Sequence, residues 1–228
     1  MPTVFITGAS RGIGLEFAKH YAGLGWQVIA GVRAPDTATA LSSLSAGGNV
    51  SIERLDVTDD AAVDAVAAKL KGHAIELLIN NAGIYGDRDA ALSIGNFDTY
   101  RRVLATNIAA PMKVALSLLP NLKLADGAKI LTISSRMGSI GLSGGGSYVY
   151  RSSKAGVNAA MHALALDLKP QGITAIVAHP GWVRTDMGGS GADISVQESV
   201  AGLTSVIARA TLADSGKFFN YDGAELAW

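Results

Sequence analysis

The stretch Thr3-Val4-Phe5-Ile6-Thr7-Gly8-Ala9-Ser10-Arg11-Gly12-Ile13-Gly14 decides the fold of this 228-residue chain. A short apolar strand runs into a glycine-rich turn, and a helical pattern over Gly14–Leu24 follows. Such a turn lets the backbone approach an anionic group, and the helix N-terminus adds free N–H groups and a positive dipole end. The spacing is G-x-x-x-G-x-G, not the commoner G-x-G-x-x-G. It predicts a phosphate-binding turn, with a tight turn packed by small residues as the alternative.

Beyond this stretch, short apolar runs alternate with longer helical patterns. We expect strands at Thr3–Thr7, Gln27–Val32, Val50–Leu55, Leu77–Asn80, Lys129–Ser134, Thr174–Ala178 and Lys217–Asn220. We expect helices at Gly14–Leu24, Asp59–Leu70, Phe97–Leu119, Val149–Leu168 and Val196–Ala210. Strands that alternate with helices form a parallel sheet covered on both faces. The sequence therefore predicts one doubly wound α/β domain, a Rossmann fold of about seven strands, over residues 1–228.

Composition excludes several classes of protein. Nineteen Lys and Arg balance nineteen Asp and Glu, so there is no excess positive charge to attract nucleic acid or an anionic membrane. The absence of cysteine excludes a disulfide scaffold, a thiolate metal site and a cysteine nucleophile. Four scattered histidines do not suggest a metal site either. Since no secretory signal or run of roughly 18 apolar residues is visible, we expect a soluble, cytoplasmic protein.

Two helical segments, near residues 108–119 and 150–168, are apolar on more than one face. A helix that lies on a sheet needs only one apolar face. We therefore expect a homodimer or homotetramer formed through these two segments. The alternative is that both helices are buried within their own domain.

The second predicted strand, Gln27–Val32, bears on the choice of nucleotide. In dinucleotide-binding folds that prefer NAD, an acidic residue at the end of this strand binds the ribose 2′-hydroxyl. Here Arg33 follows the strand, and Arg11 lies in the glycine-rich turn. Two guanidinium groups suit a 2′-phosphate, so the pattern predicts NADP(H). The alternative is a pair of solvated surface arginines.

A candidate catalytic group lies further along the chain. Ser135 follows the fifth predicted strand, and Tyr150 and Lys154 open the next helix. Residues four apart share one face of a helix, and a nearby ammonium group lowers the pKa of a phenol. We expect Tyr150 to exchange a proton near neutral pH and Ser135 to polarise a substrate carbonyl. Ser134 and Ser139 remain alternatives to Ser135.

Taken in order, these motifs resemble those of the short-chain dehydrogenase/reductase family over essentially the whole chain. The matching residues are Thr7–Gly14, Asp56-Val57, Asn80-Asn81-Ala82-Gly83, Asn107, Ser135, Tyr150, Lys154 and Pro180-Gly181-Trp182-Val183-Arg184-Thr185. The ending, Gly216–Trp228, is most similar to the carbonyl-reductase-like branch that contains sniffer and the C-factor proteins.

The resemblance implies a role for each matching residue. Tyr150 would be the general acid, Lys154 would lower its pKa and hold the nicotinamide ribose, and Ser135 would bind the substrate oxygen. Asn107 would bind a water that links Lys154 to solvent. The cofactor-binding residues would be Gly8, Ser10, Arg11, Gly12, Ile13, Gly14, Arg33, Asp56, Val57, Asn81, Ala82, Gly83, Tyr150, Lys154, Pro180, Gly181, Val183 and Thr185.

The function implied is reduction of an aldehyde or ketone to an alcohol, or the reverse, with NADP(H). A loop near residues 185–198, rich in glycine, would cover a small-molecule substrate whose identity the sequence does not reveal. The alternative is a non-catalytic dinucleotide-binding protein with a signalling or regulatory role. A complete set of Asn107, Ser135, Tyr150 and Lys154 argues against it, because a protein that only binds needs no proton relay.

Overall fold

A computed structural model describes residues 1–87 and 96–228. Within these residues seven parallel strands form one sheet, in the order β3-β2-β1-β4-β5-β6-β7. Their bounds are β1 Thr3–Thr7, β2 Gln27–Val32, β3 Val50–Arg54, β4 Leu77–Asn80, β5 Lys129–Ile133, β6 Thr174–His179 and β7 Phe218–Asn220. The predicted fold class is confirmed, and each predicted strand is present to within one residue at either end.

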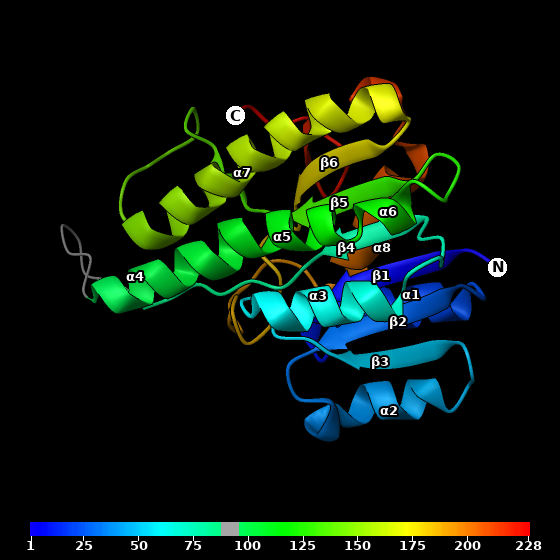
Figure 1. The fold of residues 1–228 in the computed structure, drawn as a ribbon. Coiled ribbons are helices and arrows are strands. Elements are labelled where there is room, and N and C mark those ends of the chain that lie inside the picture. Colours follow the sequence, from blue (N-terminus) through cyan, green and yellow to red (C-terminus); the bar gives the residue numbers. More distant parts are fainter. Residues whose placement is uncertain (88–95) are drawn as a thin grey trace.

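Helices cover both faces of this sheet (Figure 1). Their bounds are α1 Gly12–Gly23, α2 Thr39–Ser45, α3 Asp60–Lys69, α4 Phe97–Leu104, α5 Ala110–Ser117, α6 Leu119–Leu122, α7 Tyr148–Leu168 and α8 Val196–Arg209. One face carries α3, α5 and α7, and the other carries α1, α2 and α8. None of the helices described is long and apolar enough to cross a membrane.

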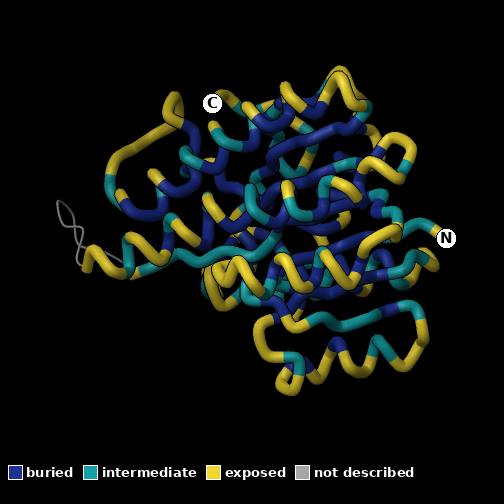
Figure 2. The backbone as a smooth tube through the Cα atoms, in the orientation of Figure 1, coloured by how far each residue is buried: buried dark blue, intermediate teal, exposed yellow. Residues whose placement is uncertain are grey.

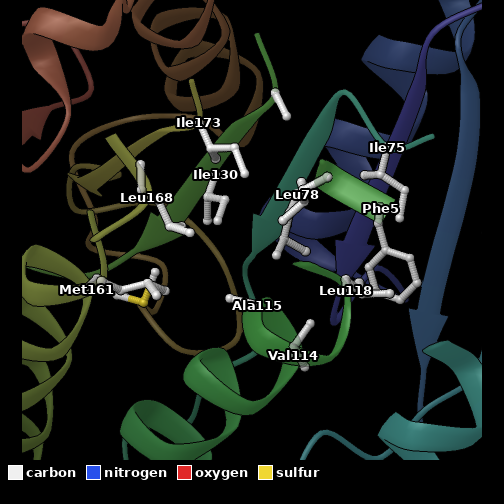
Figure 3. Packing of buried hydrophobic residues seen from close by; sticks show 14 of the residues in the cluster. Phe5, Ile75, Leu78, Val114, Ala115, Leu118, Ile130, Met161, Leu168 and Ile173 are labelled. Carbon is white, nitrogen blue, oxygen red and sulfur yellow. The ribbon is translucent and has the colours of Figure 1, made fainter. Parts of the chain in front are cut away.

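The side-chain alternation of β1 shows how the two faces acquire separate cores. Phe5 points to the face covered by α3, α5 and α7, whereas Val4 and Ile6 point to the opposite face. Figure 3 shows Phe5 with its neighbours Leu78 and Leu118 in the first of these cores. Figure 2 shows the sheet as the buried centre of the molecule, with exposed segments around it. A strand buried on both faces explains the continuous apolar run in the sequence.

Two helix predictions need correction. The short helix α2 between β2 and β3 was not predicted. The predicted single helix Phe97–Leu119 is divided: α4 passes into a π-helical turn at Ala105–Ala109 before α5 begins. Pro111 has no N–H to donate to the carbonyl of Asn107 and its ring crowds that group, so the regular ladder cannot continue there.

The order of the strands determines where a ligand can bind. The chain places β2 and β3 on one side of β1 and β4 to β7 on the other. Because all strands are parallel, the loops after β1, β4, β5 and β6 meet at one edge of the sheet. The first turns of α4 and α7, which are in contact, extend beyond the sheet on this side (Figure 1). All of the predicted motifs therefore gather at the carboxyl edge.

Candidate active site at the carboxyl edge of the sheet

The glycine-rich turn between β1 and α1 is shaped by close backbone contacts. Gly8 and Gly12 have φ angles of 66° and 55°, in the left-handed region that favours glycine. A Cβ atom at Gly14 would lie 2.4 Å from the carbonyl oxygen of Gly8 and 2.5 Å from Asn81 Nδ2. The turn therefore tolerates no side chain at this position, and its backbone is open to a bound anion.

Hydrogen bonds across the central strand pair hold this turn in place. The hydroxyl of Thr7 accepts hydrogen bonds from the backbone N–H groups of Asn81 and Ala82, each at 3.0 Å. The amide of Asn81 donates to the carbonyl oxygens of Thr7 and Gly8 at 2.9 and 3.1 Å. The loops that follow β1 and β4 thus form one rigid unit at the point where the strand order reverses.

This unit fits the pyrophosphate of a dinucleotide. The first turn of α1 presents its N–H groups beside side-chain-free backbone, which is the arrangement that binds phosphate in α/β folds. Ile13 packs against the core beneath the turn, while Ser10 and Arg11 are exposed. Gly83 and Gly181 supply further close-packed backbone at the same edge. The predicted glycine-rich cradle therefore has the geometry that the cofactor requires.

Arg11 has a partner that the sequence did not indicate. Its guanidinium lies 2.7 Å from the carboxylate of Asp186, in the segment after β6, and both side chains are exposed. Arg33 is exposed at the end of β2, where its charge lowers the pKa of Asp56. Arg11 thus forms a pair with Asp186, whereas the sequence analysis expected it beside Arg33.

Asp56 and Val57 follow β3 directly. The backbone N–H of Thr58 donates to the Asp56 carboxylate at 2.9 Å, and this bond is the main reason that the pKa of Asp56 lies below its usual range. Val57 is buried in the core shared with α3. The ionised carboxylate of Asp56 is a hydrogen-bond acceptor near Arg33. It lies where the sequence predicts that the adenine binds.

Tyr150 and Lys154 lie in the first turns of α7 and are both buried. The Lys154 ammonium donates to the carbonyl oxygen of Ile133 at 2.9 Å and lies 5.7 Å from the centre of the Tyr150 ring. The side chain of Ser135 lies close enough to Tyr150 to act on the pKa of its phenol. The structure therefore brings together three of the four predicted catalytic residues.

Burial dominates the ionisation of this pair. It raises the pKa of Tyr150 to about 12, although the side chain of Ser135 acts in the opposite direction. Burial also lowers the pKa of Lys154 to about 8. The pKa of Tyr150 is thus raised, opposite to the lowering that the sequence predicts, because the cost of burying a phenolate is the largest influence on it. At neutral pH Tyr150 is a protonated phenol.

The three candidate serines have different environments. Ser135 precedes a short 3₁₀ turn at Arg136–Gly138, and its hydroxyl accepts from the N–H of Met137 at 3.1 Å. Ser134 is buried against α7 and donates to Asn158 Oδ1 at 2.6 Å. Ser139 donates to the carbonyl oxygen of Trp228 at 3.1 Å. Among these serines, Ser135 is the one that acts on the pKa of Tyr150 in the described part of the chain.

Asn107, the fourth predicted catalytic residue, lies in the π-helical turn. Its side chain binds both backbone groups of Ile84: Nδ2 donates to the carbonyl at 2.8 Å, and Oδ1 accepts from the N–H at 2.9 Å. It also donates to Ser153 at 2.9 Å. A Cβ atom at Gly83 would lie 3.3 Å from Asn107 Oδ1 and 3.6 Å from Lys154 Nζ, so glycine allows both groups to approach.

The segment after β6 folds back over the site. Pro180 is buried. Gly181 has a φ angle of 85°, and a Cβ there would meet Ile194. Val183 pairs with Ile194 in an isolated bridge. Thr185 lies against the glycine-rich turn, with its methyl group 3.4 Å from a Cβ built at Gly12. The predicted motif Pro180–Thr185 therefore packs against the glycine-rich turn.

Two aromatic residues of the site were missed by the sequence analysis. Tyr85 stacks on Tyr150, with ring centres 4.4 Å apart and planes inclined by 22°. Trp228 stacks on Phe218, and its carbonyl oxygen accepts from the N–H of Gly141 at 3.0 Å. For Tyr85, its position two residues after the Asn80–Gly83 motif was a signal that the sequence offered. Trp228 is distant in sequence and gave none.

The structure also has a cavity of about 630 Å³ at the opposite edge of the sheet. It is lined by residues at the amino ends of β5 and β6, among them Lys129 and Thr174. The ammonium of Lys129 donates a hydrogen bond to the carbonyl oxygen of Ile207 at 2.7 Å. Since none of the predicted site residues lines this cavity, the candidate site remains the carboxyl edge.

Comparison with known proteins agrees with this geometry. The C-signal protein of Myxococcus xanthus is 38% identical over 68% of this chain and 93% of its own length. The NADPH-bound carbonyl reductase from chicken fatty liver is 37% identical, with a TM-score of 0.93 over 100% of this chain and 99% of that one. Carbonyl reductase Sniffer of D. melanogaster is 35% identical, also with a TM-score of 0.93, over the full length of both chains.

A family model described as short chain dehydrogenase matches residues 2–193. A dehydrogenase from Rhodococcus, 1-hydroxy-2-glutathionyl-2-methyl-3-butene dehydrogenase, is 32% identical over the full length of both proteins. The fold, the glycine-rich turn and the buried Tyr150–Lys154 pair are in accord with these matches. The chain belongs to the short-chain dehydrogenase family and is an oxidoreductase.

Proposed function

We propose that this protein is an NADP(H)-dependent carbonyl reductase that converts an aldehyde or ketone to an alcohol, with Tyr150 as the proton donor. The observation that carries the proposal is the packing of Tyr150, Lys154 and Ser135 at the carboxyl edge of the sheet, beside the glycine-rich turn. The similarity to the two carbonyl reductases named above supports it.

The protein's part in the reaction is to bind, orient and protonate. Gly8, Gly12 and Gly14 would hold the pyrophosphate, Asp56 the adenine, and Lys154 the nicotinamide ribose. When bound, the nicotinamide supplies the hydride. The remaining residues of the glycine-rich turn and of the segment Pro180–Thr185 would complete the cofactor site.

The raised pKa of Tyr150 suits the reductive direction. A phenol with a pKa of about 12 is protonated across the physiological range, and so it carries the proton that the reduction consumes. Its proton would pass to the carbonyl oxygen of the substrate, which the Ser135 hydroxyl also binds. Lys154, with a pKa lowered to about 8, would replace that proton through the relay predicted for Asn107.

The preference for NADP(H) is supported by Arg33 and by the absence of an acidic residue directly after Gln27–Val32, whereas Arg11 is paired with Asp186. Arg33 is exposed and lies near Asp56 at the predicted adenine end. In the variant Arg33→Asp, a carboxylate would face the 2′-phosphate and repel it. We expect NADPH to bind much more weakly to this variant while NADH binding changes little. Equal effects on the two nucleotides would contradict the 2′-phosphate assignment.

The proposal is tested by NADPH consumption with a panel of aldehydes and ketones. We expect turnover by the wild-type protein and a fall in kcat of roughly 10²–10⁴-fold in Tyr150→Phe, because the variant lacks the general acid. NADPH affinity, measured by fluorescence titration, should stay close to that of the wild type. If both proteins bind NADPH and neither reduces any carbonyl, the alternative below replaces this one.

The alternative is a dinucleotide-binding protein with a signalling or regulatory role. The similarity to C-signal over 68% of the chain favours it. Against it stands the complete set of Tyr150, Lys154, Ser135 and Asn107, three of which are buried polar residues with specific partners. Buried polar groups cost stability unless they are hydrogen-bonded, and a protein that only binds the dinucleotide has no need to keep this set together, so we favour the reductase.

Three further statements remain part of the proposal. We infer that residues 185–198 border the substrate, since Thr185 packs against the glycine-rich turn. A homodimer or homotetramer through residues 108–119 and 150–168 is supported by Leu116 and Leu166, which are about half exposed on α5 and α7. The cytoplasmic location remains a prediction from the sequence.

A further inference from the structure

The aromatic ring of Tyr85 lies against that of Tyr150, and the proposed function gives Tyr85 no role. It lies in the loop that leaves β4, three residues after Ala82, and is partly buried. Its ring stacks on that of Tyr150 with centres 4.4 Å apart. A stacked ring restricts the rotation and tilt of its neighbour, and it excludes water from the face that it covers.

The backbone beneath Tyr85 is fixed. Asn107 binds both the N–H and the carbonyl of the preceding residue, Ile84, at 2.9 and 2.8 Å. The following residue, Gly86, has a φ angle of 86°, and a Cβ there would lie 2.9 Å from Val103. Tyr85 therefore projects from a short segment held on both sides, which makes it a rigid support for Tyr150.

The hydroxyl of Tyr85 forms a second link to the same helix. It lies 3.0 Å from the hydroxyl of Ser147, the residue just before α7. Ser147 has a φ angle of 46°, in the left-handed region, where a residue other than glycine is strained. The carbonyl of Ser147 accepts from the N–H of Arg151 at 2.9 Å, so its conformation determines how the first turn of α7 begins. Tyr150 lies in that turn.

We propose that Tyr85 is a positioning residue for the general acid: its stacked ring and its hydrogen bond to Ser147 hold the Tyr150 phenol in the orientation for proton transfer. This inference rests on the proposed function of Tyr150. The Tyr85 ring also covers one face of the Tyr150 phenol, and burial is the main cause of the raised pKa of Tyr150. Tyr85 thereby helps to keep the donor protonated.

Two variants separate the two contacts. Tyr85→Phe keeps the stacked ring and removes the hydrogen bond to Ser147, whereas Tyr85→Leu removes the ring. Tyr100→Phe is the matched control, because the Tyr100 hydroxyl lies 3.1 Å from Ser152 and so links α4 to the same helix without touching Tyr150. Each variant is measured for kcat, for KM with NADPH and with the carbonyl, and for stability in urea.

The second readout is independent of activity. Tyrosine labelled with ¹³C at Cζ reports ionisation by NMR, and the Tyr150 signal is the one missing from Tyr150→Phe. We expect Tyr85→Leu to lower kcat by roughly two- to tenfold, the range that a stacked ring pair supports, with KM for NADPH unchanged. We also expect its Tyr150 signal to titrate at lower pH. Tyr85→Phe should keep the wild-type titration, and Tyr100→Phe should match the wild type throughout.

The inference is overturned if Tyr85→Leu has the wild-type kcat and the wild-type Tyr150 titration, or if Tyr100→Phe lowers kcat as much as Tyr85→Leu does. A wild-type protein that reduces no carbonyl would contradict the proposed function instead. In that case the NMR titration still decides the inference, since a Tyr150 signal unmoved by Tyr85→Leu refutes the positioning and a shifted one supports it.

Discussion

The two halves of the candidate site are built in different ways. The cofactor half, around Gly8–Gly14 and Asn81–Gly83, is held by backbone contacts too close for a side chain and by hydrogen bonds between adjacent strands. The other half, which we propose borders the substrate and call the substrate half, consists of the segments 139–147 and 182–195, in which more than half of the residues are exposed. Its apolar side chains include Ile140 and Trp182, which are 79% and 53% exposed.

The difference follows from what each half must recognise. A pyrophosphate has one shape, so a rigid backbone cradle serves it. The substrate half is held mainly by hydrogen bonds within each segment, such as the one from the Trp182 indole to the carbonyl of Gly188, with one bond from Ser139 to the carbonyl of Trp228, 89 residues away. Segments of this kind tolerate substitution, and they can change specificity without disturbing the cofactor half.

The largest effect is expected in the cofactor half, at Gly14. The Cβ atom of Gly14→Ala would overlap the Gly8 carbonyl and the Asn81 amide, so the turn must open. We expect the free energy of unfolding to fall by about 3 kcal/mol and NADPH affinity to fall by roughly a hundredfold, as misplacement by about 1 Å can cause.

Gly23→Ala is the control for this variant. Gly23 ends the same helix, and a Cβ there meets nothing within 4 Å among the described residues. It should raise stability slightly, since alanine is the better helix former. Urea unfolding and fluorescence titration measure both effects. Equal behaviour of the two variants would show that the turn is not sterically constrained.

A smaller effect is expected from the hydrogen bonds that join the two loops of the cofactor half. Thr7→Val leaves the N–H groups of Asn81 and Ala82 without their acceptor, which should cost about 2 kcal/mol of unfolding free energy. Thr132 on β5 is equally buried, but its hydroxyl has no partner among the described residues. Thr132→Val should therefore be neutral or stabilising. A loss of stability in Thr132→Val as large as in Thr7→Val would contradict this account.

The smallest effect is expected in the substrate half. Ser139→Ala removes the side-chain bond to Trp228 and the acceptor for the N–H of Leu142. We expect KM for the carbonyl to rise by roughly fivefold, the equivalent of about 1 kcal/mol, with NADPH affinity unchanged. Ser143→Ala, at an exposed position of the same segment, is the control. A loss of NADPH affinity in Ser139→Ala would show that the two halves are coupled.

Much of the fold was readable because its signals are local. The seven strands were predicted to within one residue because several are continuous apolar runs and all lie between turn or helix signals. The helix α2 was missed because it is short and its sequence, TALSSLS, has only two apolar leucines. The π-helical turn at Ala105–Ala109 was missed because its cause, Pro111, lies beyond the turn. A proline inside a helical pattern does not by itself predict a π-helical turn.

The candidate site shows the same division. Spacing alone placed Tyr150 and Lys154 on one face of a helix, and the structure has them there. Spacing did not reveal how far they are buried, so the predicted direction of the Tyr150 pKa shift was wrong. The charge of Arg11 was visible, but its partner, Asp186, lies 175 residues away.

The sequence by itself determined the doubly wound sheet, the glycine-rich turn and the order of the catalytic motifs. These depend on the period of apolar residues and on glycine, both of which act between near neighbours in the chain. Only the tertiary structure decided that Ser135 rather than Ser134 lies next to Tyr150, that Tyr85 stacks on the phenol, and that Ser139 is bonded to Trp228. Burial and contact between distant segments arise from packing, and packing is a property of the whole chain.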